Sequence, residues 1–144
     1  LASRLVRTVG HPAGLVAGLP VHALRSSDVV ENMKVLLDMG VEAILDEFGT
    51  SPDEMAWLVD IPVRSVRISG RLVARTGENV SVTPFSGALK SLVDLVHQAG
   101  ASVIVDGVHT RAQATWWREI GADTAIGDAF GQPCSSGELA ARLG

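Results

Sequence analysis

The chain has 144 residues, of which 47% are hydrophobic and 19% charged, and its net charge is −4. This length and composition indicate one folded domain, residues 1–144, in which residues 1–18 are left unassigned. The basic residues are dispersed, which excludes the basic patch typical of nucleic-acid or anionic-lipid binding. The lone Cys134 excludes an internal disulfide and favours a cytoplasmic protein. No apolar run is long enough to span a membrane.

The first elements in chain order are predicted to be a strand, a helix and a second strand. A short strand is predicted at residues 19–24. Residues 29–39 then place apolar side chains on one helical face, and Gly40 follows where helices commonly end. The run VEAIL at residues 41–45 reads as a buried strand.

The middle of the chain begins with a helix-start pattern. Ser51–Glu54 has the sequence of a capping box with proline at the first helical position, which predicts a helix that ends near Asp60. Residues 63–68 read as the next strand. Residues 70–87 show no clear periodicity and are predicted to be irregular.

The last part of the chain repeats the alternation of helix and strand. A helix is predicted at residues 88–99 and a strand at residues 102–106. Thr110–Gln113 forms a second capping-box pattern and begins another helix. Residues 124–130 read as a short strand and loop, and Ser136 is placed to cap a terminal helix.

Strands that alternate with helices of about ten residues are typical of an α/β fold with a parallel sheet buried on both faces. Five strands fit part of a TIM-like (β/α) barrel, because a closed barrel of eight normally takes about 250 residues. Ligands of such folds bind at the carboxyl ends of the strands. Five candidate site residues lie at these ends: Asp46, Glu47, Arg67, Asp106 and His109.

Four motifs, in order within residues 40–133, resemble those of the EAL domain family of cyclic-di-GMP phosphodiesterases. LDEFGTS resembles the family's DDFGTG, and PVRSVRISGRLV resembles PVDYLKIDRSFV. VIVDGVHTRAQ resembles AEGVETEEQ, and IGADTAIGDAFGQP resembles LGCDYVQGYLFGRP. The resemblance implies the second part of an EAL barrel, from about its fourth strand to its eighth. The stretch with the EAL tripeptide has no counterpart in this match.

The resemblance also implies a chemistry, in which one or two Mg²⁺ or Mn²⁺ ions activate water to attack a phosphodiester. Asp46 matches the first aspartate of the family's pair, whereas Glu47 is longer than the second. Aligning LPVHAL with the family's LEITES puts His22 and Ala23 in place of a Thr-Glu ligand pair.

Further along, Arg67 replaces the family's lysine, Asp106 replaces a longer glutamate, and His109 replaces a second acid. Hard cations need several oxygen ligands at fixed positions. We therefore expect a vestigial site that binds no metal or other cofactor. Mg²⁺ or Mn²⁺ would bind only if the site were intact. This interpretation predicts that the chain is not an enzyme.

Each candidate residue also has a purely structural interpretation. Asp46 and Glu47 either order the following loop, one of them paired with Arg67, or bind a metal or ligand. Asp106 and His109 either pair with each other to order a loop or act as metal ligands. The adjacent Trp116 and Trp117 either pack in the core or anchor an interface.

The sequence thus favours a catalytically inactive EAL-like module of bacterial signalling that regulates by protein interaction. An open sheet needs a cover for its apolar face, which predicts self-association or a protein partner. The alternatives are a non-catalytic cyclic-di-GMP receptor and a weak metal-dependent cyclic-di-GMP phosphodiesterase. Binding to polymeric nucleic acid and insertion into a membrane are not expected.

Overall fold

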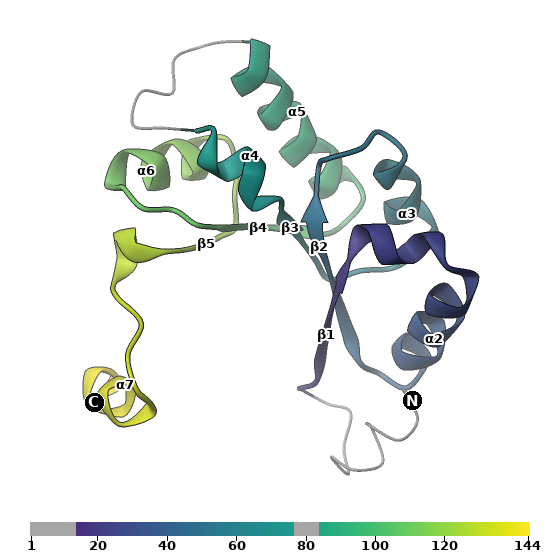
Figure 1. Cartoon of the computed structure of the whole chain (residues 1–144), viewed down its shortest axis with the longest axis horizontal. Helices are drawn as coiled ribbons and strands as arrows, with labels where there is room; N and C mark the ends of the chain where they lie inside the picture. The colour runs from purple at the N-terminus through teal and green to yellow at the C-terminus, as the bar shows by residue number, and fades with distance from the viewer. Residues whose placement is uncertain (1–13, 77–83) are drawn as a thin grey trace.

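The computed structural model describes residues 14–76 and 84–144, which form a five-stranded sheet with helices packed along it (Figure 1). The strands are ordered as they occur in the chain, and every neighbouring pair is parallel. They are β1 (Val16–Pro20), β2 (Glu42–Phe48), β3 (Ser65–Ile68), β4 (Ser102–Asp106) and β5 (Thr124–Ile126). The predicted α/β fold, with five parallel strands alternating with helices, is confirmed.

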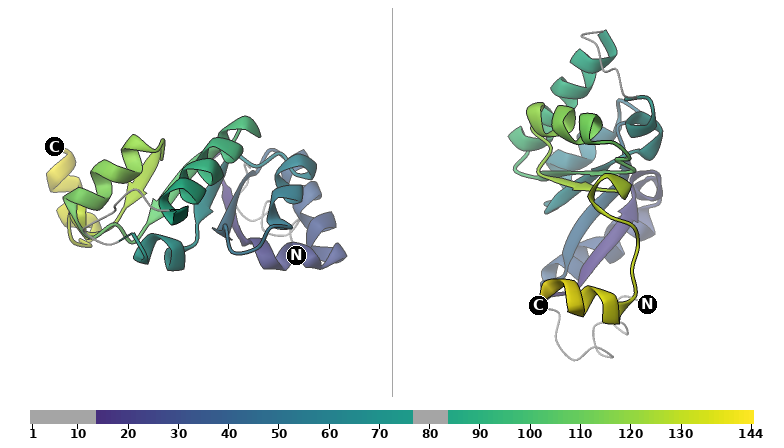
Figure 2. Two further views of the ribbon diagram at one scale, coloured as in Figure 1. Left: turned by 90° about the horizontal axis from the view of Figure 1, so that it is seen from above. Right: turned by 90° about the vertical axis from the view of Figure 1, so that its left-hand side faces the viewer.

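Helices connect successive strands, as parallel pairing requires. The α-helices are α2 (Ser27–Asp38), α3 (Glu54–Asp60), α4 (Gly70–Ala74), α5 (Pro84–Gln98), α6 (Arg111–Glu119) and α7 (Ser136–Leu143). Two 3₁₀ helices, η1 (Val21–Arg25) and η2 (Asp128–Phe130), follow β1 and β5. Figure 2 shows the strands twisting along the length of the sheet, with α5 and α6 stacked on the same side.

The strands alternate between buried and partly exposed residues, as the two-residue period of a strand dictates. The core side of the sheet is buried against the helices through fully or nearly fully buried side chains: Ala43, Leu45, Val66, Ile68, Val103 and Val105. The intervening residues of β4, Ile104 and Asp106, are only partly buried. The expectation of a sheet buried on both faces is therefore wrong for the described residues, which cover one face and leave the other open.

The first predicted strand is displaced. The structure ends β1 at Pro20, so residues 19–24 overlap it by two residues only and continue as η1. Val21 and Leu24 are both buried. Residues three apart lie on one side of a 3₁₀ helix but on opposite sides of a strand, so burying both favours the helix.

The predicted capping box at Ser51–Glu54 does not form. The helix α3 begins at Glu54, and its N-cap residue Asp53 makes no side-chain capping bond. The side chain of Glu54 turns back to the preceding loop instead, where it accepts hydrogen bonds from Gly49 and Thr50.

Residues 70–87 were expected to be irregular, but the structure places α4 and the beginning of α5 within them. Pro84 opens α5, a position where proline's missing N–H costs no helical hydrogen bond. Residues 77–83 of the same segment lie outside the described residues.

The second predicted capping box is confirmed. The hydroxyl of Thr110 accepts from the backbone N–H of Gln113, 3.1 Å away, and the Gln113 side chain accepts from the N–H of Thr110. The amide of Gln113 also donates to the backbone oxygen of Thr76 at 2.6 Å, and Trp117 Nε1 donates to the Thr76 hydroxyl at 3.2 Å. This buried network joins the end of α4 to α6.

The helix α7 stands apart from the sheet at the end of an extended segment (Figure 1). Ser135, one residue before the predicted Ser136, is its N-cap and forms a capping box with Glu138. All residues of α7 are exposed, including Leu139 and Leu143. None of the described helices combines the length and apolar character needed to cross a membrane.

Asp123, just before β5, gives a test of how this edge of the sheet is held. Its Oδ2 atom accepts from the N–H of Val103 at 2.7 Å and contacts His97 Nε2 at 2.8 Å. Burial raises the pKa of Asp123, but the bonds from Val103 and His97 outweigh that effect and hold the pKa below 3.8. The charged form of Asp123 therefore stabilises the fold above this pH, and the stabilisation is lost as the pH falls through the lowered pKa.

We predict that Asp123→Asn lowers the free energy of unfolding by about 1 kcal/mol at pH 7, because the site is half exposed and screened by solvent. Urea unfolding at several pH values should show this difference shrinking below about pH 4. Asp60→Asn, at the exposed end of α3, is the matched control. A difference that persists unchanged at pH 3 would contradict the account.

Candidate functional site

The carboxyl ends of β2 and β3 bring Asp46 and Arg67 together. Arg67 Nη1 donates to Asp46 Oδ2 at 3.1 Å, and each side chain is about one-third exposed, 33% for Arg67 and 32% for Asp46. Arg67 lies between the buried Val66 and Ile68, so its side chain is on the open face of the sheet. The predicted pairing of the acidic pair with Arg67 is therefore observed for Asp46.

The guanidinium of Arg67 retains unused hydrogen-bonding capacity. Its Nε atom is buried and has no hydrogen-bond partner among the residues that the structure describes. Buried donors are normally paired, because leaving one unpaired costs about 1–3 kcal/mol. Arg67 is thus held by Asp46 through Nη1, its Nε donor is covered by protein, and about one-third of the side chain remains exposed on the open face.

Asp46 and Glu47 are adjacent in sequence but turn to different partners. The pairing of β2 with β3 is irregular between Leu45 and Phe48, and Glu47 has a left-handed backbone with φ 58°. Such a bulge redirects a side chain at the end of a strand. The carboxyl group of Glu47 lies 3.2 Å from His22 Nδ1, and both side chains are mostly exposed.

His109 does not pair with Asp106 but with Asp128, whose Oδ2 lies 3.4 Å from His109 Nδ1. The contact depends on Gly127, where a Cβ atom would lie 2.2 Å from the backbone oxygen of Val108. The loop after β5 can therefore approach the loop after β4 closely. The predicted pairing of Asp106 with His109 is wrong.

Asp128 is a partner that sequence reasoning did not assign to His109. Its place at the end of the last strand was the available signal, since neighbouring parallel strands bring their carboxyl ends to one edge of the sheet. Asp106 is partly buried at the same edge, on the open face. A cavity of about 560 Å³ includes Asp106, His109 and Asp128 among its lining residues.

A second cavity, of about 540 Å³, lies at the carboxyl ends of β2 and β3. Its lining combines residues from η1, from the end of β2 and the turn after it, and from the beginning of α4, and it mixes polar and apolar surface. The residues are Val21, His22, Glu47, Thr50, Ser69, Gly70 and Arg71. Ligand sites of parallel α/β folds form at this end of the strands, and of the two cavities there this one adjoins the Asp46–Arg67 pair at the ends of β2 and β3, which makes it the candidate for binding.

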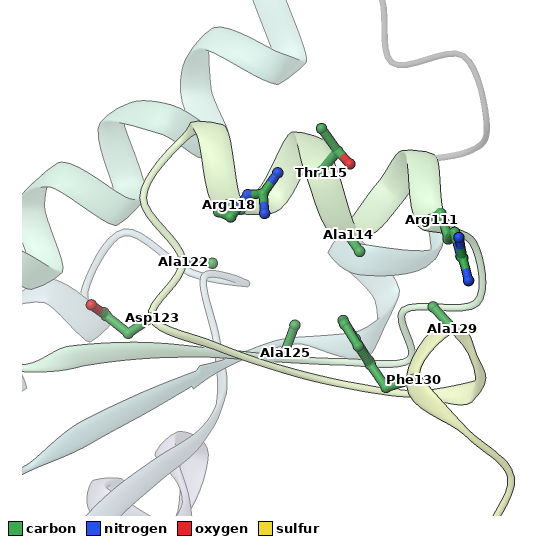
Figure 3. Close-up of a pocket in the computed structure, with 9 residues that line it drawn as sticks. All are labelled: Arg111, Ala114, Thr115, Arg118, Ala122, Asp123, Ala125, Ala129 and Phe130. Atoms are coloured by element: carbon green, nitrogen blue, oxygen red, sulfur yellow. The ribbon is translucent and has the colours of Figure 1, made fainter.

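A third cavity, of about 470 Å³, lies between α6 and β5 (Figure 3). Arg111 and Arg118 extend from α6 along it, and Phe130 borders it from η2. The acidic residues at the carboxyl ends of β2 and β4 do not line it. This cavity is therefore separate from the candidate site at the strand ends.

The described residues were tested for a metal site through their donor groups. They contain no group of three or more histidine, cysteine, aspartate or glutamate side chains placed to hold a metal ion. The Asp46 carboxyl group is engaged by Arg67, and that of Glu47 faces His22. A hard cation needs several oxygen donors around one point, and the described residues alone do not fit that requirement.

Trp116 and Trp117 were a candidate interface pair. Trp117 is fully buried and bonded to Thr76, so it is a core residue and is not available to a partner. Trp116 is partly buried, and its ring packs edge-on against that of Trp117 with centroids 5.0 Å apart. Of the two, only Trp116 retains surface for an interface.

A parallel sheet with sequential strand order, connecting helices and polar side chains at its carboxyl edge defines a segment of a TIM-like barrel. The chain belongs to the EAL domain family, whose model matches residues 1–133. This match begins well before the four motifs that indicated the family, which start near residue 40. EAL domains belong to cyclic-di-GMP signalling proteins, and that part of the prediction is confirmed.

Known relatives are longer than this chain. The oxygen sensor protein DosP of Escherichia coli is 25% identical over 113 residues, which are 78% of this chain and 14% of DosP. The PaMucR phosphodiesterase in complex with c-di-GMP superposes with a TM-score of 0.79 at 22% identity, covering 95% of this chain and 55% of PaMucR. The chain thus covers about half of the PaMucR structure and a much smaller part of DosP.

Another solved neighbour carries a metal. Klebsiella pneumoniae BlrP1, in a complex with manganese and cyclic-di-GMP, superposes with a TM-score of 0.75 at 19% identity, covering 92% of this chain and 34% of BlrP1. We predicted no cofactor for this chain. A solved neighbour of the same fold binds manganese, so a metal cofactor is plausible for the family.

The prediction that the chain is not an enzyme is contradicted by these comparisons. The chain belongs to the EAL family, and its solved neighbours include a phosphodiesterase. The prediction inferred inactivity from substituted ligand positions. Those substitutions change the side chains at the strand ends, but they do not place the chain outside a family of enzymes.

Gly49 gives a test of how closely the turn after β2 is packed. It has φ 98°, and a Cβ atom there would come 2.8 Å from side-chain carbons of both Leu72 and Leu92. Gly100 has a similar φ of 83° but open space around the Cβ position. Both alanine variants carry the cost of a left-handed backbone, about 1–2 kcal/mol.

We predict that Gly49→Ala lowers the free energy of unfolding by at least about 1 kcal/mol more than Gly100→Ala, because overpacking adds to the backbone strain. Urea denaturation of both variants beside the parent protein measures the difference. Equal destabilisation would show that the leucines move aside freely and that the turn is not tightly packed.

Proposed function

We propose that this chain forms part of a cyclic-di-GMP phosphodiesterase-type domain and binds the dinucleotide at the carboxyl edge of its sheet. The observation that carries this proposal is Arg67, whose guanidinium is held by Asp46, lies on the open side of the sheet and belongs to a side chain that is 33% exposed. A guanidinium in this state suits a phosphate oxygen, because its donors form strong charge-assisted hydrogen bonds.

The cavity at the ends of β2 and β3 supports an anionic ligand with polar groups, and Arg67 lies outside its lining. The cavity of about 540 Å³ at the same edge has Arg71 and His22 in its lining, together with the hydroxyl-bearing Thr50. Its size falls in the range of about 300–1,000 Å³ that is usual for small-molecule sites. Cyclic-di-GMP offers phosphates to the arginines and two guanine bases to the polar groups.

The reaction proposed for the domain is hydrolysis of a phosphodiester bond in the bound dinucleotide. The described residues account for binding and orientation: Arg67 for a phosphate, and Asp46 for holding Arg67 in place. The solved neighbour BlrP1 was found with manganese and the dinucleotide. The described donors alone do not form a metal site.

A second proposal concerns protein contacts. The open face of the sheet and the exposed Leu139 and Leu143 of α7 present apolar surface that a monomer of the described residues leaves uncovered. Surfaces of this kind are typical of interfaces. We propose that the domain contacts protein through them, within the cytoplasm.

The binding proposal is tested by calorimetry with cyclic-di-GMP. We expect the parent protein to bind, and Arg67→Met to raise the Kd at least about tenfold, because a charge-assisted hydrogen bond is lost. Arg118→Met removes an exposed arginine of α6 and is the matched control, with an unchanged Kd expected. A parent protein that shows no heat of binding at high micromolar dinucleotide would overturn the proposal.

Hydrolysis is tested separately by chromatography of cyclic-di-GMP incubated with the protein and Mn²⁺. Formation of the linear dinucleotide, lost when EDTA is added, is the expected result. Circular dichroism of Arg67→Met must show a folded protein for the comparison with the parent to hold. Binding without product would leave the binding proposal standing and contradict the hydrolytic one.

A further inference from the structure

Glu54 is a buried acidic residue that neither the family motifs nor the proposed binding residues explain. It opens α3 and is only 5% exposed. Its Oε2 atom accepts from the N–H of Gly49 at 2.6 Å and from the N–H of Thr50 at 3.1 Å. Its Oε1 atom accepts from the Thr50 hydroxyl at 2.7 Å. All three bonds go to two successive residues of the turn after β2.

This pattern determines the conformation of the turn. Burying a carboxyl group is costly unless hydrogen bonds compensate, so the side chain and the turn stabilise one another. Gly49 supplies the positive φ that lets two successive N–H groups point at one oxygen. The turn has little freedom as long as Glu54 is present.

The fixed turn is also a wall of the candidate binding cavity. Its lining includes Glu47 and Thr50 from the end of β2 and the turn after it, and Ser69 and Arg71 from the beginning of α4. These two segments are joined directly, because the N–H of Ser69 donates to the backbone oxygen of Phe48 at 2.8 Å. Movement of residues 49–50 would therefore change the shape of the cavity.

We infer that Glu54 is a positioning residue for the cyclic-di-GMP site, acting through the turn of residues 47–50 and not through contact with the ligand. The inference rests on the proposed binding function. It assigns to Glu54 the task of holding the cavity in its binding shape before the dinucleotide arrives, which lowers the cost of ordering the site on binding.

A different role for Glu54 would be to stabilise α3 alone, since acidic side chains favour helix N-termini. The two roles depend on different properties of the side chain. A helix role needs negative charge at this position, which Glu54→Asp keeps. The positioning role needs the reach and the acceptor geometry, which Glu54→Gln keeps: one oxygen can accept from both N–H groups, and the amide can donate to the Thr50 hydroxyl.

The experiment compares Glu54→Gln, Glu54→Asp and Glu54→Ala with the parent protein and with Asp60→Ala, an exposed acidic position at the other end of α3. Backbone amide exchange at Gly49 and Thr50, followed by NMR without ligand, reports on the turn. Calorimetry with cyclic-di-GMP reports on the cavity. Circular dichroism selects conditions in which each variant is folded.

We expect Glu54→Asp and Glu54→Ala to lose amide protection at both turn residues and to raise the Kd at least about tenfold, as the loss of two or more hydrogen bonds implies. Glu54→Gln should keep both properties within about threefold, and Asp60→Ala should not change them. Should Glu54→Ala not fold, Glu54→Asp against Glu54→Gln decides the question.

Two results would overturn the inference. One is a Kd for Glu54→Asp within about threefold of the parent value, and the other is loss of binding in Glu54→Gln as large as that in Glu54→Asp. Failure of the parent protein to bind cyclic-di-GMP is a separate result that removes the proposed function. In that case amide exchange in Glu54→Ala still tests whether Glu54 holds the turn. Unchanged exchange at Gly49 and Thr50 would contradict that role, whereas lost protection would support it independently of any ligand.

Discussion

The structure depends on the one-sided burial of a parallel sheet. Leu45, Val66 and Val103 are each 0% exposed and pack against the helices. Because successive residues of a strand point to opposite faces, this burial fixes the direction of every side chain between them. Asp46, Arg67 and Asp106 are consequently placed on the open face, near the carboxyl ends of their strands. Apolar packing on one side therefore selects the polar groups that meet on the other.

The elements with a strong local pattern could be predicted from sequence. The strand at residues 102–106 and the capping box of Thr110 and Gln113 are found where the pattern placed them. The box at Ser51–Glu54 had an equally good pattern but failed, because the Glu54 side chain makes three hydrogen bonds to the preceding turn. A four-residue pattern does not reveal a competing partner that the fold supplies.

The contacts of the candidate site were likewise predictable only in part. The pairing of Asp46 with Arg67 was predictable because the two residues end neighbouring strands and carry opposite charges. The pairing of His109 with Asp128 was predictable only as far as both residues follow neighbouring strands, because the contact itself requires the loop after β5 to come close to Val108, where only a glycine fits. The motifs identified the family correctly, but replacement of individual ligand types was a poor guide to whether the chain belongs among enzymes.

The network around Gln113 restricts which side chains position 113 can accept. At helix N-termini glutamate is usually the natural exchange for glutamine, since either one completes a capping box. Here the same side chain must also donate a hydrogen bond to the carbonyl oxygen of Thr76. A glutamate would present two oxygens to each other inside the core, and a buried pair of acceptors is repulsive. Replacement of Gln113 by glutamate, which is the mildest change chemically, is thus poorly tolerated by this fold. A substitution that other helix N-termini accept is excluded at this position.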